Sequence, residues 1–213
     1  MEIKEILDSI FIVSFGKQIE LAKTFIRFQE YFENSVFKGK IFTLEEFKKW
    51  YIKNSIKGKK TGKFTYYQDW DGFNIPSYAL KPFYEGRFNP LTKYEKKLLA
   101  VFKNKKNKNF YIIGTSKEIS IATLNHEISH GLFYINPEYR TQVLRVIRKI
   151  NSQDKKKLKD FLLKYGGYHS AVLDDEIHAY LLDRRCLGKN GVSGKGLKIA
   201  GDKIKNFFKE FYT

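Results

Sequence analysis

Three residues within one short segment have the types and spacing that could hold a metal ion and use it. They are His126, Glu127 and His130, which form the pattern H-E-x-x-H. In a helix, residues i and i+4 lie one turn apart on the same face, so both imidazoles can bind one ion. The carboxylate between them can then reach a water molecule bound to that ion. We predict that the two histidines are metal ligands and that Glu127 is a general base.

A catalytic zinc ion needs a third protein ligand and one open position, and the acidic segment downstream supplies the candidates. We favour Glu176, because it shares a helical face with Ala179, whose small side chain allows a close approach to the first helix. An error of one residue in helical phase would exchange Glu176 for Asp175, and His178 as the ligand would give a three-histidine site. Asp174 and His178 are four residues apart, and we expect them to form a pair on another face.

The reaction also needs a donor for an oxyanion, and the segment Tyr-Gly-Gly-Tyr-His at residues 165–169 is the expected source. Its two glycines allow a turn that could bring Tyr168 or His169 to the open side of the metal. The alternative is that the glycines end a helix and that both residues lie on a surface loop.

The pattern H-E-x-x-H, followed 46 residues later by Glu176-x-x-Ala179, resembles the gluzincin zinc metallopeptidases. The resemblance covers roughly residues 110–185 and does not extend to residues 1–109. Gluzincins often carry an aspartate four residues after the glutamate, and this chain departs from them by having Tyr180 there.

The resemblance implies a zincin-like fold and one Zn²⁺ per chain, held by His126, His130 and Glu176. It also implies that Glu127 activates water and that the substrate is a peptide or protein. Two alternatives stay open: a non-haem iron oxygenase built on the same ligands, and a basic protein associated with nucleic acid whose metal site is structural or degenerate. Glu127 favours hydrolysis, because an oxygenase needs no general base between its histidines.

The composition limits the other possibilities. The formal net charge of +17 suggests a polyanionic partner, but only 7 of the 40 basic residues are arginine and the charge is spread along the chain. We therefore regard nucleic acid as possible but not favoured. A single cysteine excludes an intramolecular disulfide and a thiolate metal site. We expect no membrane span and no signal peptide, hence a cytoplasmic protein, while the oligomeric state stays open.

These residues must be positioned by helices and strands, and the pattern of expected elements predicts an α+β fold. We expect this fold to be mostly helical, with a small mixed sheet packed on the active-site helix. A strand is expected at residues 109–114, followed by a helix that begins at a capping box over 115–118 and ends at Asn136 before Pro137. Further helices are expected at 137–150, 154–165, 170–185 and 197–212.

The first half of the chain is expected to contain a strand at 10–15, a helix at 18–33 and helices opened by capping boxes at Thr43 and Thr92. Residues 63–68 have the composition of a strand, and 69–76 that of a turn. Two lysine-rich segments, 55–62 and 103–109, are expected to be mobile loops.

We expect an N-terminal lobe over residues 1–109, which completes the sheet and the cleft wall, and a metal-site lobe over 110–213. Together they would form one compact domain. The strand Phe110 to Ile113 could pair with an extended substrate if it lay at a sheet edge, but we favour an interior position.

Overall fold

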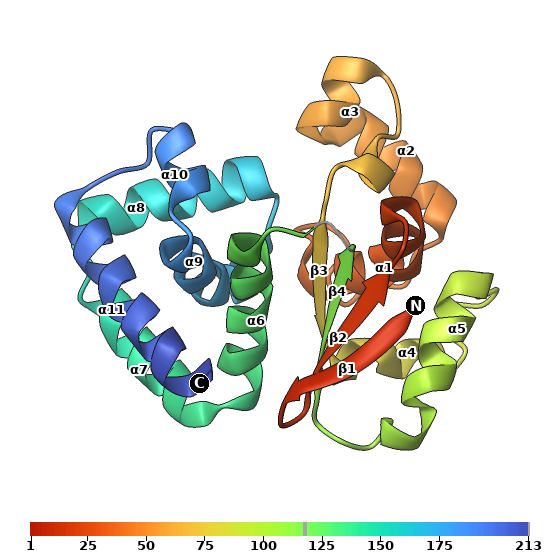
Figure 1. Ribbon diagram of the computed structural model, residues 1–213. Coiled ribbons are helices and arrows are strands. Elements are labelled where there is room, and N and C mark those ends of the chain that lie inside the picture. The colour runs from red at the N-terminus through yellow and green to blue at the C-terminus, as the bar shows by residue number, and fades with distance from the viewer. Residues whose placement is uncertain (117–118, 213) are drawn as a thin grey trace. The chain divides into compact units, whose positions relative to one another are not determined.

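The structure, a computed structural model, describes residues 1–116 and 119–212, with the side chains of residues 165 and 166 left out. The chain divides into two compact units, Met1–Ile119 and Ser120–Thr213. The strand that we placed in the metal-site lobe belongs to the first unit, because it pairs on both sides with strands of that unit. The expected α+β class is confirmed: one small mixed sheet stands beside many helices (Figure 1).

The first unit is built on a four-stranded sheet in the order β1-β2-β4-β3. The strands are β1 (Glu2–Leu7), β2 (Ile10–Phe15), β3 (Gly72–Pro76) and β4 (Tyr111–Ser116). Strands β2 and β4 are parallel, and the other two pairs are antiparallel. The interior position favoured for the strand at 110–113 is confirmed. Its pairing with an extended substrate is therefore wrong, because β2 and β3 already occupy both of its sides.

Helix α1 (Gln18–Glu33) covers the sheet and carries a large part of the first unit's core. Phe25 is fully buried and contacts the rings of Phe15 and Phe73. Gly114 in β4 lies so close to this helix that an added Cβ would stand 2.5 Å from the Phe25 ring. The remaining helices of this unit are α2 (Leu44–Asn54), α3 (Ile56–Thr61), α4 (Lys81–Tyr84) and α5 (Lys93–Phe102), with short 3-10 turns at Tyr66–Gln68, Ser77–Leu80 and Lys103–Lys105.

Some local expectations for the first unit hold and others are wrong. Thr43 and Thr92 do form capping boxes, with Glu46 and Glu95. The predicted strand at 63–68 is wrong, since the only regular structure there is a 3-10 turn, and β3 forms instead within the segment predicted as a turn. Tertiary packing explains the exchange: β3 pairs with β4 and buries four of its five residues.

Two further differences concern polar segments. Strand β1, which was not expected, is largely exposed and is held by antiparallel pairing with β2. The predicted loop at 55–62 contains α3, because Ser55 caps the Gly58 amide and Gly58 is buried against the backbone of Tyr51.

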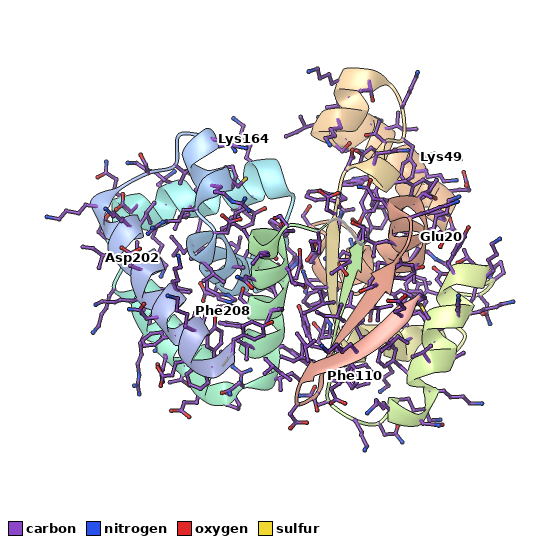
Figure 2. The ribbon with its side chains drawn as sticks, in the orientation of Figure 1. Glu20, Lys49, Phe110, Lys164, Asp202 and Phe208 are labelled. Atoms are coloured by element: carbon purple, nitrogen blue, oxygen red, sulfur yellow. The ribbon has the colours of Figure 1, made fainter. Side chains whose placement is uncertain are left out.

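The second unit is entirely helical among its described residues. Its elements are α6 (Ile121–Ile135), α7 (Pro137–Arg148), α8 (Ser152–Phe161), a π-helical turn (Leu162–Gly166), a 3-10 turn (Ser170–Val172), α9 (Leu173–Leu182), α10 (Arg185–Lys189) and α11 (Lys195–Tyr212). Helix α9 packs against α6, α7, α8 and α11 (Figure 1). On α11, Phe208 is buried among the helices whereas Asp202 lies on the surface (Figure 2). None of the helices in the described part of the chain has the length and apolar character needed to cross a membrane.

Helix α6 does not begin at the predicted capping box over 115–118. Thr115 and Ser116 belong to β4 and pair with β2, while residues 117 and 118 lie outside the described residues. The N-cap is Ser120, whose hydroxyl accepts the Thr123 amide hydrogen at 3.1 Å. The predicted end is confirmed, since Asn136 ends α6 and caps α7.

Candidate metal centre

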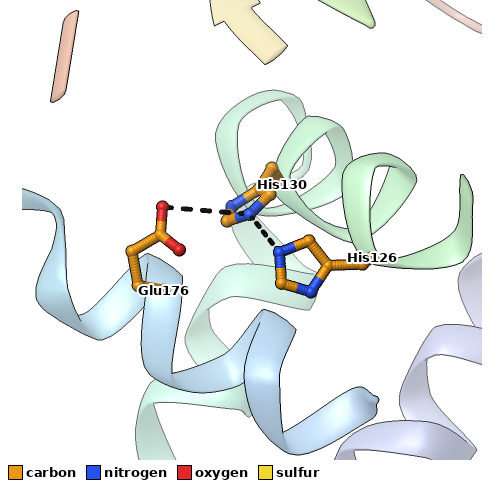
Figure 3. Close-up of side chains that lie close together, drawn as sticks. All are labelled: His126, His130 and Glu176. Carbon is orange, nitrogen blue, oxygen red and sulfur yellow. Dashed lines mark hydrogen bonds and ion pairs between the residues drawn. The ribbon is translucent and has the colours of Figure 1, made fainter. Parts of the chain in front are cut away.

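The side chains of His126, His130 and Glu176 point toward one another from helices α6 and α9 (Figure 3). One potential ligand atom from each residue lies within 4.8 Å of the other two. The Nε2 atoms of the two histidines are 3.3 Å apart, and His130 Nε2 is 3.9 Å from Glu176 Oε1. The three residues predicted as metal ligands are thus brought together.

The distance between the two histidine nitrogens agrees with one shared tetrahedral ion. Zinc binds histidine nitrogen at about 2.0–2.1 Å, and a tetrahedral angle then separates two such nitrogens by about 3.3 Å. The observed Nε2 to Nε2 distance is 3.3 Å. Without an ion, the two ring nitrogens can share one hydrogen, so the distance fits a bound ion and also fits a hydrogen bond between the rings.

Asp175 orients one of these rings. Its Oδ1 lies 2.8 Å from His130 Nδ1, so the Nδ1 hydrogen is donated to the carboxylate and Nε2 is directed at the cluster. Burial alone would lower the pKa of His130, but the negative charges of Asp175 and Glu176 outweigh burial and raise that pKa to about 10. Without an ion His130 is therefore protonated, and an ion that binds Nε2 would displace the proton there.

His126 is oriented differently. Its ring hydrogen-bonds the backbone carbonyl of Ala179, and the ring of Tyr180 stands edge-on at 5.1 Å. Burial, reinforced by the positive charges of His130 and His178, lowers the pKa of His126 to about 3. His126 is therefore neutral, which is the form that binds a metal.

Glu176 gives the clearest indication that the cluster suits a cation. Its side chain is only 3% exposed, and its Oε2 atom has no hydrogen-bond partner among the described residues. Burial raises the pKa of Glu176 to about 8, although the positive charge of His130 and a hydrogen bond from Tyr168 oppose the rise. A buried carboxylate oxygen without a partner costs free energy that a bound cation would recover. The donor set and this oxygen fit a zinc ion.

Glu127, between the two histidines in sequence, belongs to the same cluster. It is 7% exposed, and its negative charge raises the pKa of both His130 and Glu176. The predicted general base therefore lies within electrostatic range of two of the three proposed ligands.

His178, the third-ranked candidate ligand, has another role. It is fully buried, with Nδ1 2.5 Å from the Asp175 carbonyl oxygen and Nε2 3.2 Å from that of Ser129, so it links α9 to α6. Its ring also stacks on Phe133 at 4.9 Å. The predicted pair with Asp174 is wrong: His178 contacts Asp175, and Asp174 is exposed.

The two predicted oxyanion donors, Tyr168 and His169, make different contacts. Tyr168 lies at the cluster, where it hydrogen-bonds Glu176 and its hydroxyl is 3.2 Å from that of Tyr180. His169 instead caps a 3-10 turn, since its Nδ1 accepts the Ala171 amide hydrogen at 3.1 Å. That contact accounts for His169 locally and gives it no link to the three ligand residues.

Sequence reasoning missed the outer contacts of the cluster. Asp175 was weighed only as an alternative ligand, and Tyr180 only as a departure from a family pattern. Their positions in the sequence gave a usable signal. The residue directly before Glu176 on α9 can face His130, and the residue four positions after Glu176 lies one turn further along the face of α9 that carries Glu176.

Comparisons with protein-family models, with curated protein sequences and with solved structures gave no match to this chain.

Proposed function

We propose that this protein is a zinc-dependent hydrolase of peptide bonds. The observation that carries the proposal is that half-buried His126 meets buried His130 and Glu176, with their potential ligand atoms within 4.8 Å of one another and one carboxylate oxygen of Glu176 unsatisfied. Glu127, buried beside them, supplies the base that this chemistry requires. A zincin-like fold, a peptide or protein substrate and a cytoplasmic location belong to the same proposal.

A zinc ion with three protein ligands supplies a water molecule whose pKa is lowered to about 7 and a Lewis acid that polarises a carbonyl. The residues of the chain supply the rest. Asp175 accepts a hydrogen bond from Nδ1 of His130, so Nε2 is the ring nitrogen that would bind the ion. The Ala179 carbonyl holds the ring of His126 in the same way.

Glu127 would accept the proton of the attacking water and deliver it to the leaving amine. Its burial and its position in the sequence next to a proposed ligand histidine support this role. Tyr168 is the remaining donor, because its hydroxyl lies beside Glu176 and could hydrogen-bond the oxyanion of a tetrahedral intermediate. His169 stays the second candidate donor: its Nδ1 caps a turn, which leaves Nε2 as the ring nitrogen that could donate.

The experiment begins with metal content. Protein purified without added metal and without a metal-binding tag is measured by elemental mass spectrometry, beside His126→Ala and Glu176→Ala. We expect about one zinc per chain in the wild type, none in His126→Ala and less in Glu176→Ala. Iron in place of zinc would favour the oxygenase, and no metal even after zinc is offered would refute the hydrolase.

Activity is then tested on a peptide library read by mass spectrometry, with Glu127→Gln as the matched control. Glutamine keeps the size of the side chain but cannot accept the proton. We expect Glu127→Gln to retain zinc and to lose cleavage by about 10²-fold or more. Equal cleavage by both proteins would refute the role of Glu127, and zinc binding without cleavage by either would leave a metal-binding protein that is no peptidase.

A further inference from the structure

A second site lies in the helical unit, between α7 and α11 and apart from the metal cluster. The two helices run antiparallel, since Tyr139 at the start of α7 contacts Phe211 at the end of α11 (Figure 1). Between them is a hollow of about 640 Å³, lined on the α11 side from Gly196 to Phe207. Eleven steps of 1.5 Å make that side about 17 Å long, or about three helical turns.

The lining is apolar along the middle and basic on both walls. Val146 and Phe207 contribute apolar surface, and Ile199 is 49% exposed there. Arg145 and Lys149 stand on the α7 side, and Lys203 stands on the α11 side. Within the described chain, none of these three cations forms an ion pair with a carboxylate.

We propose that this groove binds an acidic amphipathic helix of a partner protein. Helices dock into grooves through an apolar stripe of residues spaced three and four apart. A stripe flanked by acidic residues on both sides would meet Arg145 and Lys149 on one wall and Lys203 on the other, as flanking charges do in coiled coils.

The charges distinguish this occupant from two others. A fatty carboxylate has one charged head and would need its cations gathered at one end, whereas these stand on both walls. A second copy of the same chain would bring a net charge of +17 against a basic groove, so self-association is disfavoured.

The test uses the full chain and a synthetic peptide of roughly 18 residues, about five helical turns, with leucine along one face and glutamate on both flanks. Binding is followed by fluorescence anisotropy and mapped by NMR of backbone amides. We expect saturable binding that weakens as salt is added, with shifts confined to α7 and α11. A scrambled peptide of the same composition, which has no apolar stripe, should bind at least about tenfold more weakly.

Matched variants locate the site. We expect the double variant Lys149→Glu, Lys203→Glu to weaken binding by about tenfold, and Ile199→Ser to weaken it as well. The control Lys198→Glu, Lys205→Glu makes the same change of charge on exposed α11 residues outside the groove and should bind as the wild type does. Amide spectra of each variant establish that it is folded.

Several results would overturn the proposal. They are the absence of peptide binding, equal binding of the scrambled peptide, and an equal loss in the control variant. Dodecanoate that shifts the same amides while the peptide does not would assign the groove to fatty carboxylates instead. None of these results depends on zinc or on peptide cleavage.

Discussion

Replacing Asp175 by asparagine would remove one charge from the metal centre while keeping a hydrogen-bond acceptor in place. The Asp175 carboxylate lies 2.8 Å from His130 Nδ1, and its side chain is 14% exposed. The amide oxygen of asparagine can still accept the Nδ1 hydrogen, so the tautomer of His130 should persist. The variant therefore isolates the effect of the charge.

The expected loss of zinc affinity follows from this geometry. Loss of an outer partner of a ligand histidine costs about 10- to 100-fold, or about 1.4–2.7 kcal/mol. The lower end applies to Asp175→Asn, because the acceptor remains and because the pKa of His130 falls, which weakens the competition from protons. Asp175→Ala removes the acceptor as well and leaves a buried N–H without a partner, so the upper end applies there.

The assay is competition for zinc against a chromophoric chelator at fixed pH, with thermal unfolding as a second readout. A tenfold weaker affinity should reduce the stabilisation by saturating zinc by about 1.4 kcal/mol. Asp174→Asn is the matched control, since it makes the same change at the neighbouring exposed residue. We expect its zinc affinity to equal that of the wild type.

Two results would refute this reasoning. If Asp175→Asn bound zinc as tightly as the wild type, the contact with His130 would have no part in metal binding. If Asp174→Asn lost as much affinity as Asp175→Asn, the effect would reflect general charge and not the orientation of His130.

Three further predictions concern the first unit. Burial raises the pKa of Glu30 from 4.5 to about 7, so the folded state holds the Glu30 proton more tightly than the unfolded state does. The stabilisation that this proton gives is complete below about pH 4.5 and falls by about 3 kcal/mol as the pH rises past 7. Urea unfolding at pH 5 and pH 8 should show a fall that is larger by about 2.5 kcal/mol in the wild type than in Glu30→Gln, because groups of the metal centre also titrate in this range, and equal falls would contradict the prediction. Arg27→Met should lower the free energy of unfolding by about 3–5 kcal/mol in the same assay, because Arg27 donates two 2.6 Å hydrogen bonds to Glu95, which is only 1% exposed. A decrease below about 1 kcal/mol would show that other groups compensate the buried charge of Glu95. Gly114→Ala should cost about 1–3 kcal/mol through overpacking, whereas the control Gly188→Ala, with nothing within 4 Å of the added carbon, should change stability little; equal effects would argue against the close contact.

Local rules were sufficient for several parts of the fold. The capping boxes at Thr43 and Thr92 formed because the hydroxyl, the carboxylate and both amides lie within four residues. Asn136 and Pro137 end one helix and begin the next for equally local reasons. Local rules were insufficient where two signals competed, as at Thr115, where pairing with β2 extended the strand through a segment that also had a capping pattern.

The sheet shows what depends on distant residues. Strand β1 is polar and exposed, so no pattern within it indicated a strand, and its partner β2 holds it. Strand β3 forms in a segment rich in turn residues because β4, far along the chain, offers hydrogen bonds and a core for Phe73 and Ile75. Pairing between distant segments leaves little trace in the composition of either one.

At the metal centre, the sequence by itself determined that His126 and His130 share a helical face with Glu127 between them, because helix geometry alone fixes side chains four residues apart. Only the tertiary structure decided which acidic residue meets them. A rotation of α9 by about 100° about its axis would exchange Glu176 and Asp175. The packing of α9 against α6, including the contacts of His178, sets that rotation. Glu176 thereby faces the two histidines while Asp175 orients His130, a division of roles that no spacing along a single helix could specify.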